Sequence, residues 1–150
     1  MPIATWEPVL KVEAIRFVSV QQRRAVPSLW RAFCVTHEPG IPPAGVEDLG
    51  LTLTDWAATG DLLSDVDLVI TCDTGLAHLA GSLGRPVWIL LNSTAGAHWD
   101  IYWEFGERTP WYPTARLFRQ QRPHEWAPGM HDVAAQLEAL VRRSAEACVG

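Results

Sequence analysis

The sequence predicts an α/β fold built on a parallel sheet with helices on both faces. Residues 67–72 and 86–91 are short, continuous apolar runs, which are typical of strands buried on both faces. Segments with apolar residues at helical spacing accompany these runs, and the connections are short and rich in Gly and Pro. Strands that alternate with helices in this order pair in parallel, because each helix carries the chain back across the sheet.

Length, charge and cysteine content restrict the class of protein. With 150 residues the chain suits a single domain, residues 1–150, that can bury a core. The net charge of −5 argues against a nucleic-acid partner, so an anionic ligand needs a local site. Three cysteines without a C-x-x-C pair fit a reducing compartment. Without a signal-peptide pattern or an apolar run near the ~20 residues of a membrane span, we expect a cytoplasmic protein.

The N-terminal part of the chain predicts two short strands separated by a helix and a loop. Residues 15–20 are β-branched and aromatic, which indicates a buried strand. Residues 25–33 indicate a short helix, and the Pro- and Gly-rich residues 36–45 indicate a loop. Residues 46–51 predict a second short strand.

The middle of the chain predicts two helices around a strand. Residues 54–66 indicate a helix with Thr54 or Asp55 at its N-cap, and the strand at 67–72 follows. Residues 75–84 indicate a second helix that ends at Gly84, a residue suited to the left-handed conformation after a helix. Its predicted apolar face consists of Leu76, Leu79, Ala80 and Leu83.

The C-terminal part predicts two more strands and a long helix. Residues 86–91 indicate a buried strand, residues 92–114 an irregular aromatic section, and residues 115–120 a last short strand. Residues 129–147 indicate a helix. Its apolar face consists of Met130, Val133, Leu137 and Leu140.

The turn from strand to helix at residues 72–78 is the strongest candidate site. A helix that begins at Thr74-Gly75 has unpaired N–H groups and partial positive charge at its start, which suits phosphate oxygens. Thr74 and His78 lie roughly 40° apart around the helix, so both can face the same anion. A carboxylate repels a diphosphate, so we expect Asp73 to cap the helix or to accept from sugar hydroxyls.

The same turn has two other interpretations. In the first, Asp73 is only an N-cap, Thr74 helps the turn and His78 is a surface residue. In the second, Asp-Thr-Gly after an apolar pair is the signature of an aspartic protease, in which two carboxylates share a proton. The helical segment that follows at once and the alternation of strands and helices argue against that all-β fold.

Two longer motifs resemble one enzyme family. The stretches DLVITCDTGLAHLAGSLGRPVWILL (67–91) and PWYPTARLFRQ (110–120) occur in order, with Ser19-Val20-Gln21 upstream. Together they resemble the C-terminal half of the family-nine glycosyltransferases, which include the heptosyltransferases and relatives that are linked to tetratricopeptide repeats. The resemblance covers most of residues 15–140.

This resemblance implies half of a GT-B fold, a Rossmann-like domain that binds a nucleoside-diphosphate sugar. It also implies transfer without a metal ion, with the leaving-group charge met by helix N-termini and side chains. Carried across by position, Thr74 and Gly75 hold the diphosphate and His78 assists. Asp73 touches the sugar or caps the turn, and Gln21 lines the nucleotide. The nucleotide sugar is the substrate, and no cofactor is implied.

The chain also departs from the family pattern. The first strand of the donor domain and the entire acceptor domain, which supplies the catalytic base, have no counterpart, so no catalytic residue is named. Lys11 and Arg16 do not replace the missing basic residue, and Ala58 stands where the family has a second acid. We therefore expect a truncated chain that is inactive in isolation. Its expected partner is an N-terminal GT-B half or a second copy, bound through the aromatic residues 98–112.

Two alternative functions remain. A non-enzymatic or degenerate nucleotide-binding module fits the missing elements. A sugar-nucleotide epimerase of similar architecture is disfavoured by residues 110–113 and 116–120.

Among the remaining residues, Arg116 and Arg119 should face opposite sides of a strand, and His124 and His131 should lie at the surface.

Overall fold

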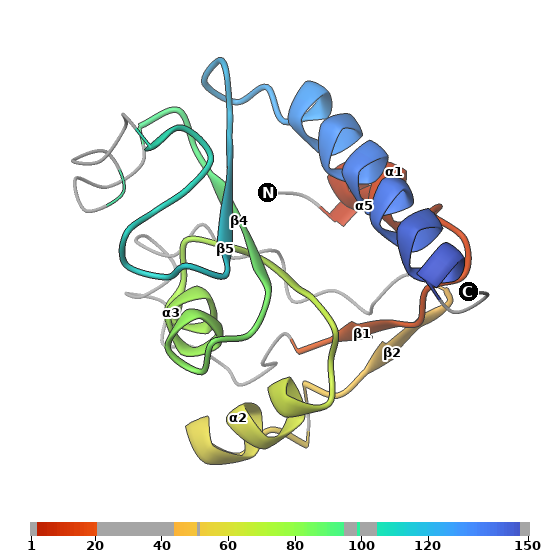
Figure 1. Cartoon of the computed structure of the whole chain (residues 1–150), viewed down its shortest axis with the longest axis vertical. Helices are drawn as coiled ribbons and strands as arrows, with labels where there is room; N and C mark the ends of the chain where they lie inside the picture. Colours follow the sequence, from red (N-terminus) through yellow and green to blue (C-terminus); the bar gives the residue numbers. More distant parts are fainter. Residues whose placement is uncertain (1–2, 21–43, 51, 95–98, 100–104, 148–150) are drawn as a thin grey trace. The chain divides into compact units, whose positions relative to one another are not determined.

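The computed structural model describes residues 3–20, 44–50, 52–94, 99 and 105–147 (Figure 1). Its elements in chain order are η1 (Ile3–Trp6), α1 (Glu7–Leu10), β1 (Phe17–Ser19), β2 (Val46–Asp48), α2 (Trp56–Ser64), β3 (Val69–Cys72), α3 (Gly75–Ser82), β4 (Val87–Leu91), β5 (Ala115–Arg119) and α5 (Ala127–Ala147). They fall into two compact units, residues 1–54 with 126–150 and residues 55–125. The predicted helix at 25–33 and most of the predicted loop at 36–45 lie outside the described residues.

The first unit contains a two-stranded parallel sheet and the long helix α5. Phe17 of β1 pairs with Val46 of β2, so the strands predicted at 15–20 and 46–51 are confirmed with narrower bounds. The three residues of β1 are half-buried, whereas a buried strand was expected. The short helix α1 packs against α5 (Figure 1). The predicted apolar face of α5 is also confirmed, since Met130, Val133 and Leu137 are buried and Leu140 is half-buried.

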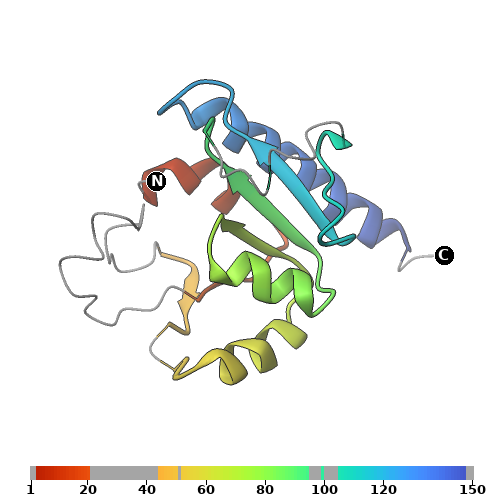
Figure 2. The same ribbon diagram turned by 90° about the vertical axis from the view of Figure 1, so that its left-hand side faces the viewer.

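The second unit contains a three-stranded parallel sheet in the order β3-β4-β5. All five residues of β4 are buried. Because successive side chains of a strand point to opposite faces, both faces of β4 are covered, as the apolar run predicts. Helix α3 lies against β3 and β4, with α2 beside it (Figure 2). The parallel strands and helices confirm the predicted α/β class.

Local signals set the ends of α2 and α3. The side chain of Asp55 accepts a hydrogen bond of 2.8 Å from the backbone N–H of Ala58, which makes Asp55 the N-cap of α2. After α3, Gly84 takes a positive φ of 67°, as predicted for a residue that ends a helix. The N–H of Arg85 donates to the carbonyl of Ala80, and that of Gly84 to the carbonyl of Gly81, which is the Schellman arrangement.

The predicted apolar face of α3 is confirmed in part, because Ala80 is buried as predicted but Leu83 is not. The buried residues are Ala77, Ala80 and Gly81, whereas Leu83 is 48% exposed. Leu76 and Leu79 are only partly buried against the core. The small side chains face the core because they permit close packing, and the helix ends at Ser82, so Leu83 does not continue the face.

Candidate functional site

The candidate site begins where β3 passes into α3. The strand ends at Cys72 and the helix starts at Gly75, so Asp73 and Thr74 alone form the turn. Thr74 is the N-cap residue, with an extended backbone (φ −147°, ψ 170°). Asp73, Thr74 and Gly75 are all exposed. The predicted strand-to-helix turn is therefore confirmed, and it lies at the carboxyl end of a parallel strand.

The hydroxyl of Thr74 is directed back toward the end of β3. Its Oγ1 lies 3.3 Å from the hydroxyl of Thr71 and donates to the carbonyl of Cys72 over 3.3 Å. The side chain of Thr74 makes no capping hydrogen bond to the helix. Asp73 was predicted as a possible N-cap, but that position belongs to Thr74 because helical geometry starts at Gly75.

His78 lies on the first turn of α3 and contacts three side chains. Its Nδ1 is 2.9 Å from the hydroxyl oxygen of Tyr112. Its ring stacks on that of Trp99, with centroids 5.5 Å apart and planes inclined by 17°. Its Nε2 is 3.9 Å from Oδ1 of Asp73. The structure thus brings Asp73 and His78 together, and His78 is half-buried rather than a free surface residue.

A tryptophan borders the exposed glycine at the start of α3. A Cβ at position 75 would lie 2.7 Å from Cη2 of Trp56, which is closer than such atoms approach. The Trp56 side chain is itself 62% exposed. Trp56 could not be predicted from the sequence, because nothing in the local pattern indicates that the first residue of α2 reaches the start of α3.

The aromatic section between β4 and β5 has two kinds of residue. Trp99 is buried at 2% exposure, and Tyr112 packs against the core, so both fill the interior. Phe105 and Trp111 are 48% and 52% exposed. His98, Tyr102 and Trp103 lie outside the described residues, as does Gln21.

The arginines of β5 have separate partners. Arg116 forms an ion pair of 2.7 Å with Glu107, and its guanidinium lies 5.0 Å from the centre of the Phe118 ring. Arg119 donates to the backbone carbonyl of Trp99 over 2.7 Å. These different contacts agree with the prediction that the two side chains face opposite sides of the strand.

Of the other residues considered from the sequence, Cys72 ends β3, and His124, His131 and Lys11 are not part of the turn. Burial raises the pKa of the Cys72 thiol, and the neighbouring Asp73 carboxylate acts in the same direction. His124 and His131 are exposed, as predicted. In the first unit, Lys11 pairs with Glu7 over 2.7 Å.

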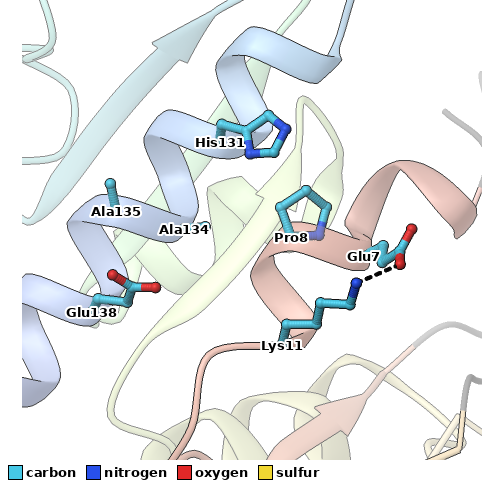
Figure 3. Close-up of a pocket in the computed structure, with 7 residues that line it drawn as sticks. All are labelled: Glu7, Pro8, Lys11, His131, Ala134, Ala135 and Glu138. Atoms are coloured by element: carbon cyan, nitrogen blue, oxygen red, sulfur yellow. Dashed lines mark ion pairs between the residues drawn. The ribbon is translucent and has the colours of Figure 1, made fainter.

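The first unit has a pocket of its own between α1 and α5. It has a volume of about 410 Å³. Its lining consists of Glu7, Pro8, Lys11, His131, Ala134, Ala135 and Glu138 (Figure 3). None of these residues belongs to the predicted site.

The described residues contain neither a group of metal ligands nor a helix that could span a membrane. No group of three or more His, Cys, Asp and Glu side chains in the described ranges has an arrangement that could hold a metal ion. Among the helices that the structure describes, none combines the length and apolar character needed to cross a membrane.

The parallel strands and helices define an α/β protein with a Rossmann-like arrangement. Residues 51–136, more than half of the chain, match the sequence model of glycosyltransferase family 9 (heptosyltransferase). The chain belongs to this family, as the motifs at 67–91 and 110–120 indicate.

One curated relative is Protein FlbA of Caulobacter vibrioides. It is 34% identical over 139 residues, which cover 91% of this chain and 21% of the relative. The chain therefore spans about a fifth of the length of that protein. No solved structure matches the chain.

Proposed function

We propose that this chain is the donor-binding part of a glycosyltransferase that uses a nucleoside-diphosphate sugar. The observation that carries the proposal is the exposed Thr74-Gly75 turn at the carboxyl end of β3, with His78 held beside it. The start of a helix carries partial positive charge and backbone N–H donors, and both favour phosphate oxygens. Membership of glycosyltransferase family 9 supports a donor with such a group.

Each residue of the turn has a proposed role. Within the part of the chain that the structure describes, the contacts of the Thr74 hydroxyl are two long ones of 3.3 Å, so it can rotate toward a phosphate at small cost. Gly75 exposes its backbone for close approach. His78 offers an imidazole N–H to the same anion, and Asp73 accepts from sugar hydroxyls. Gln21 lines the nucleotide in this proposal.

The proposal extends to the whole enzyme. The chain corresponds to the C-terminal half of a two-domain GT-B enzyme of the kind linked to tetratricopeptide repeats. Transfer then proceeds without a metal ion or cofactor, because the helix start, Thr74 and His78 take up the leaving-group charge. The acceptor half, an N-terminal partner of this chain, supplies the catalytic base. The alternative is that copies of the chain associate with one another through residues 98–112.

Calorimetric titration of the full 150-residue chain with UDP, ADP and GDP at low salt tests the proposal. We expect one nucleotide to bind, and Thr74→Ala and His78→Ala each to weaken it by at least about 1 kcal/mol, the scale of one hydrogen bond to a charged group. Thr52→Ala and His131→Ala are matched controls, because both residues are exposed and belong to the other unit. Their affinities should equal that of the unsubstituted chain.

Two results of this titration would contradict the proposal. If no nucleotide binds at millimolar concentration to a chain whose circular dichroism shows it to be folded, the chain is not an autonomous donor domain. It is then a non-enzymatic module, or one that a partner must complete. If a nucleotide binds but neither substitution changes its affinity, the turn at residues 73–75 is not the site.

A further inference from the structure

Tyr112 lies in the loop before β5 and contacts two residues of α3, Gly81 and His78. Its ring lies over Gly81, where a Cβ would be 2.4 Å from Cγ of the tyrosine. Its hydroxyl oxygen lies 2.9 Å from Nδ1 of His78. Gly81 and His78 are three positions apart on one helix, so they lie on neighbouring parts of the same surface. The glycine makes room for the ring, and the ring places its hydroxyl at the histidine.

The other ring nitrogen of His78 faces a carboxylate. In a neutral imidazole one nitrogen carries the proton and the other accepts. With Oδ1 of Asp73 at 3.9 Å from Nε2, a lone pair on Nε2 would face a negative charge, whereas an N–H on Nε2 is attracted to it. The negative charge of the Asp73 carboxylate therefore favours the form of the imidazole that carries its proton on Nε2. Nδ1 is then the acceptor, and the Tyr112 hydroxyl donates to it.

We propose that Tyr112 is a positioning residue, whose hydroxyl donates to Nδ1 of His78 and so keeps the imidazole proton on Nε2, beside the Asp73 end of the turn. Trp99 restrains the ring from a third direction by stacking on its face. A rotation of the imidazole by half a turn would exchange Nδ1 with Cδ2 and Nε2 with Cε1. It would therefore break the Tyr112 hydrogen bond and place a carbon where Nε2 now faces Asp73. The proton position and the ring orientation are thus set before a ligand arrives.

This inference rests on the proposed function in one respect only. If a diphosphate binds at the start of α3, an Nε2–H can donate to it from a ring that is already oriented. The state of the histidine itself can be measured without any ligand. The two ideas can therefore fail separately.

The direct test is ¹⁵N NMR of the histidine ring nitrogens in the full chain at alkaline pH, where imidazoles are neutral. We expect Nε2 of His78 to resonate as a protonated nitrogen and Nδ1 as an unprotonated one. In Tyr112→Phe, which removes only the hydroxyl, the ratio of the Nε2–H to the Nδ1–H form should fall roughly 2- to 10-fold, the range of one neutral hydrogen bond. His124 and His131 are exposed internal controls whose signals should not move.

Two results of this experiment overturn the proposal. One is a proton on Nδ1 in the unsubstituted chain, which would make Tyr112 the acceptor. The other is an unchanged ratio in Tyr112→Phe. If that variant does not fold, uniform replacement of tyrosine by 3-fluorotyrosine supplies a more acidic phenol in the same place. The ratio should then rise, and a constant or falling ratio counts against the proposal.

A double-mutant cycle tests whether Tyr112 acts on the ligand through His78. For the nucleotide that binds best, Tyr112→Phe should raise Kd several-fold in the unsubstituted chain and leave it unchanged when His78→Ala is already present. Equal losses in both backgrounds would show that Tyr112 acts on the ligand directly and contradict the positioning role. If no nucleotide binds while the NMR result holds, the proposed function fails and the role of Tyr112 toward His78 stands.

Discussion

The ring of Tyr112 takes the space that a side chain at Gly81 would need. A Cβ built at position 81 lies 2.4 Å from Cγ of Tyr112 and 2.7 Å from both Cδ atoms. Gly81 is buried on the core-facing side of α3, and Tyr112 packs against that core. Helix, glycine and aromatic ring therefore form one packing unit, which also carries the hydrogen bond to His78.

Substitution of this glycine should destabilise the protein. In an ordinary helix interior Gly→Ala stabilises by roughly 0.5–1 kcal/mol. Here we expect Gly81→Ala to lower the free energy of unfolding by about 1–3 kcal/mol, the cost of overpacking a core, because the Tyr112 ring must move. Urea denaturation monitored by circular dichroism measures the change.

Gly60 is the matched control for that substitution. It lies inside α2, and the nearest atom to a Cβ there is Cδ1 of Leu83 at 3.6 Å, an ordinary contact. Gly60→Ala should therefore be neutral or stabilising by up to about 1 kcal/mol. If both variants gain stability, the close approach of Tyr112 to Gly81 is not present in solution.

A methyl group at Gly75 should affect ligand binding more than folding. Its Cβ would meet Cη2 of Trp56 at 2.7 Å, but that ring is 62% exposed and can turn away. We expect Gly75→Ala to change the free energy of unfolding by less than about 1 kcal/mol and to weaken nucleotide binding. Adding Trp56→Ala removes the clash with the ring. If affinity then returns, displacement of Trp56 caused the loss, and if it does not, the methyl group itself blocks the phosphate.

The N-cap of α2 gives a prediction about stability alone. Because the carboxylate of Asp55 accepts from the N–H of Ala58, Asp55→Ala should cost about 1 kcal/mol, within the usual 0.5–2 for a lost cap. Asp55→Asn keeps an acceptor and should retain most of that stability. Thermal unfolding measures the stability of the two variants. If Asp55→Ala and Asp55→Asn lose the same amount of stability, the charge of Asp55 rather than its capping hydrogen bond is responsible.

The thiol of Cys72 should react slowly in the folded chain. Burial raises its pKa, and the thiolate is the reactive form, so less of it is present near neutral pH than in an unfolded chain. We expect iodoacetamide at about pH 8, just below the ordinary thiol pKa of about 8.5, to label Cys72 more slowly in buffer than in urea. Peptide mass spectrometry distinguishes Cys72 from Cys34 and Cys148. Equal rates in the two solvents would contradict the burial of this side chain.

Most of the described elements could be predicted from local patterns. The runs at 67–72 and 86–91 became β3 and β4, the capping residues Asp55 and Gly84 act as expected, and the turn at residues 73–75 is where the motif predicts it. These features depend on hydrogen bonds and side-chain spacing between residues only a few positions apart. A short window of sequence therefore contains the relevant information.

The apolar face of α3 shows where local patterns are insufficient. Hydrophobicity predicts that Leu76, Leu79, Ala80 and Leu83 face the core together. The structure buries Ala80 as predicted, but it also buries Ala77 and Gly81, leaves Leu76 and Leu79 partly buried and exposes Leu83. Helical spacing limits which residues share a face, but it does not choose between two overlapping faces. That choice depends on the shape of the surface against which the helix packs.

The sequence by itself determined the α/β class, the positions of β1 to β5 and of the helices α2, α3 and α5, the family, and the turn that contains Asp73, Thr74 and Gly75, whereas η1 and α1 were not predicted. Only the tertiary structure decided the surroundings of His78. Its hydrogen-bond partner Tyr112 is 34 residues away, and Trp99 joins the same cluster from another part of the chain. Tyr112 precedes β5 and Trp99 follows β4, so these contacts depend on how the two segments pack beside α3 rather than on residues neighbouring His78 in the sequence.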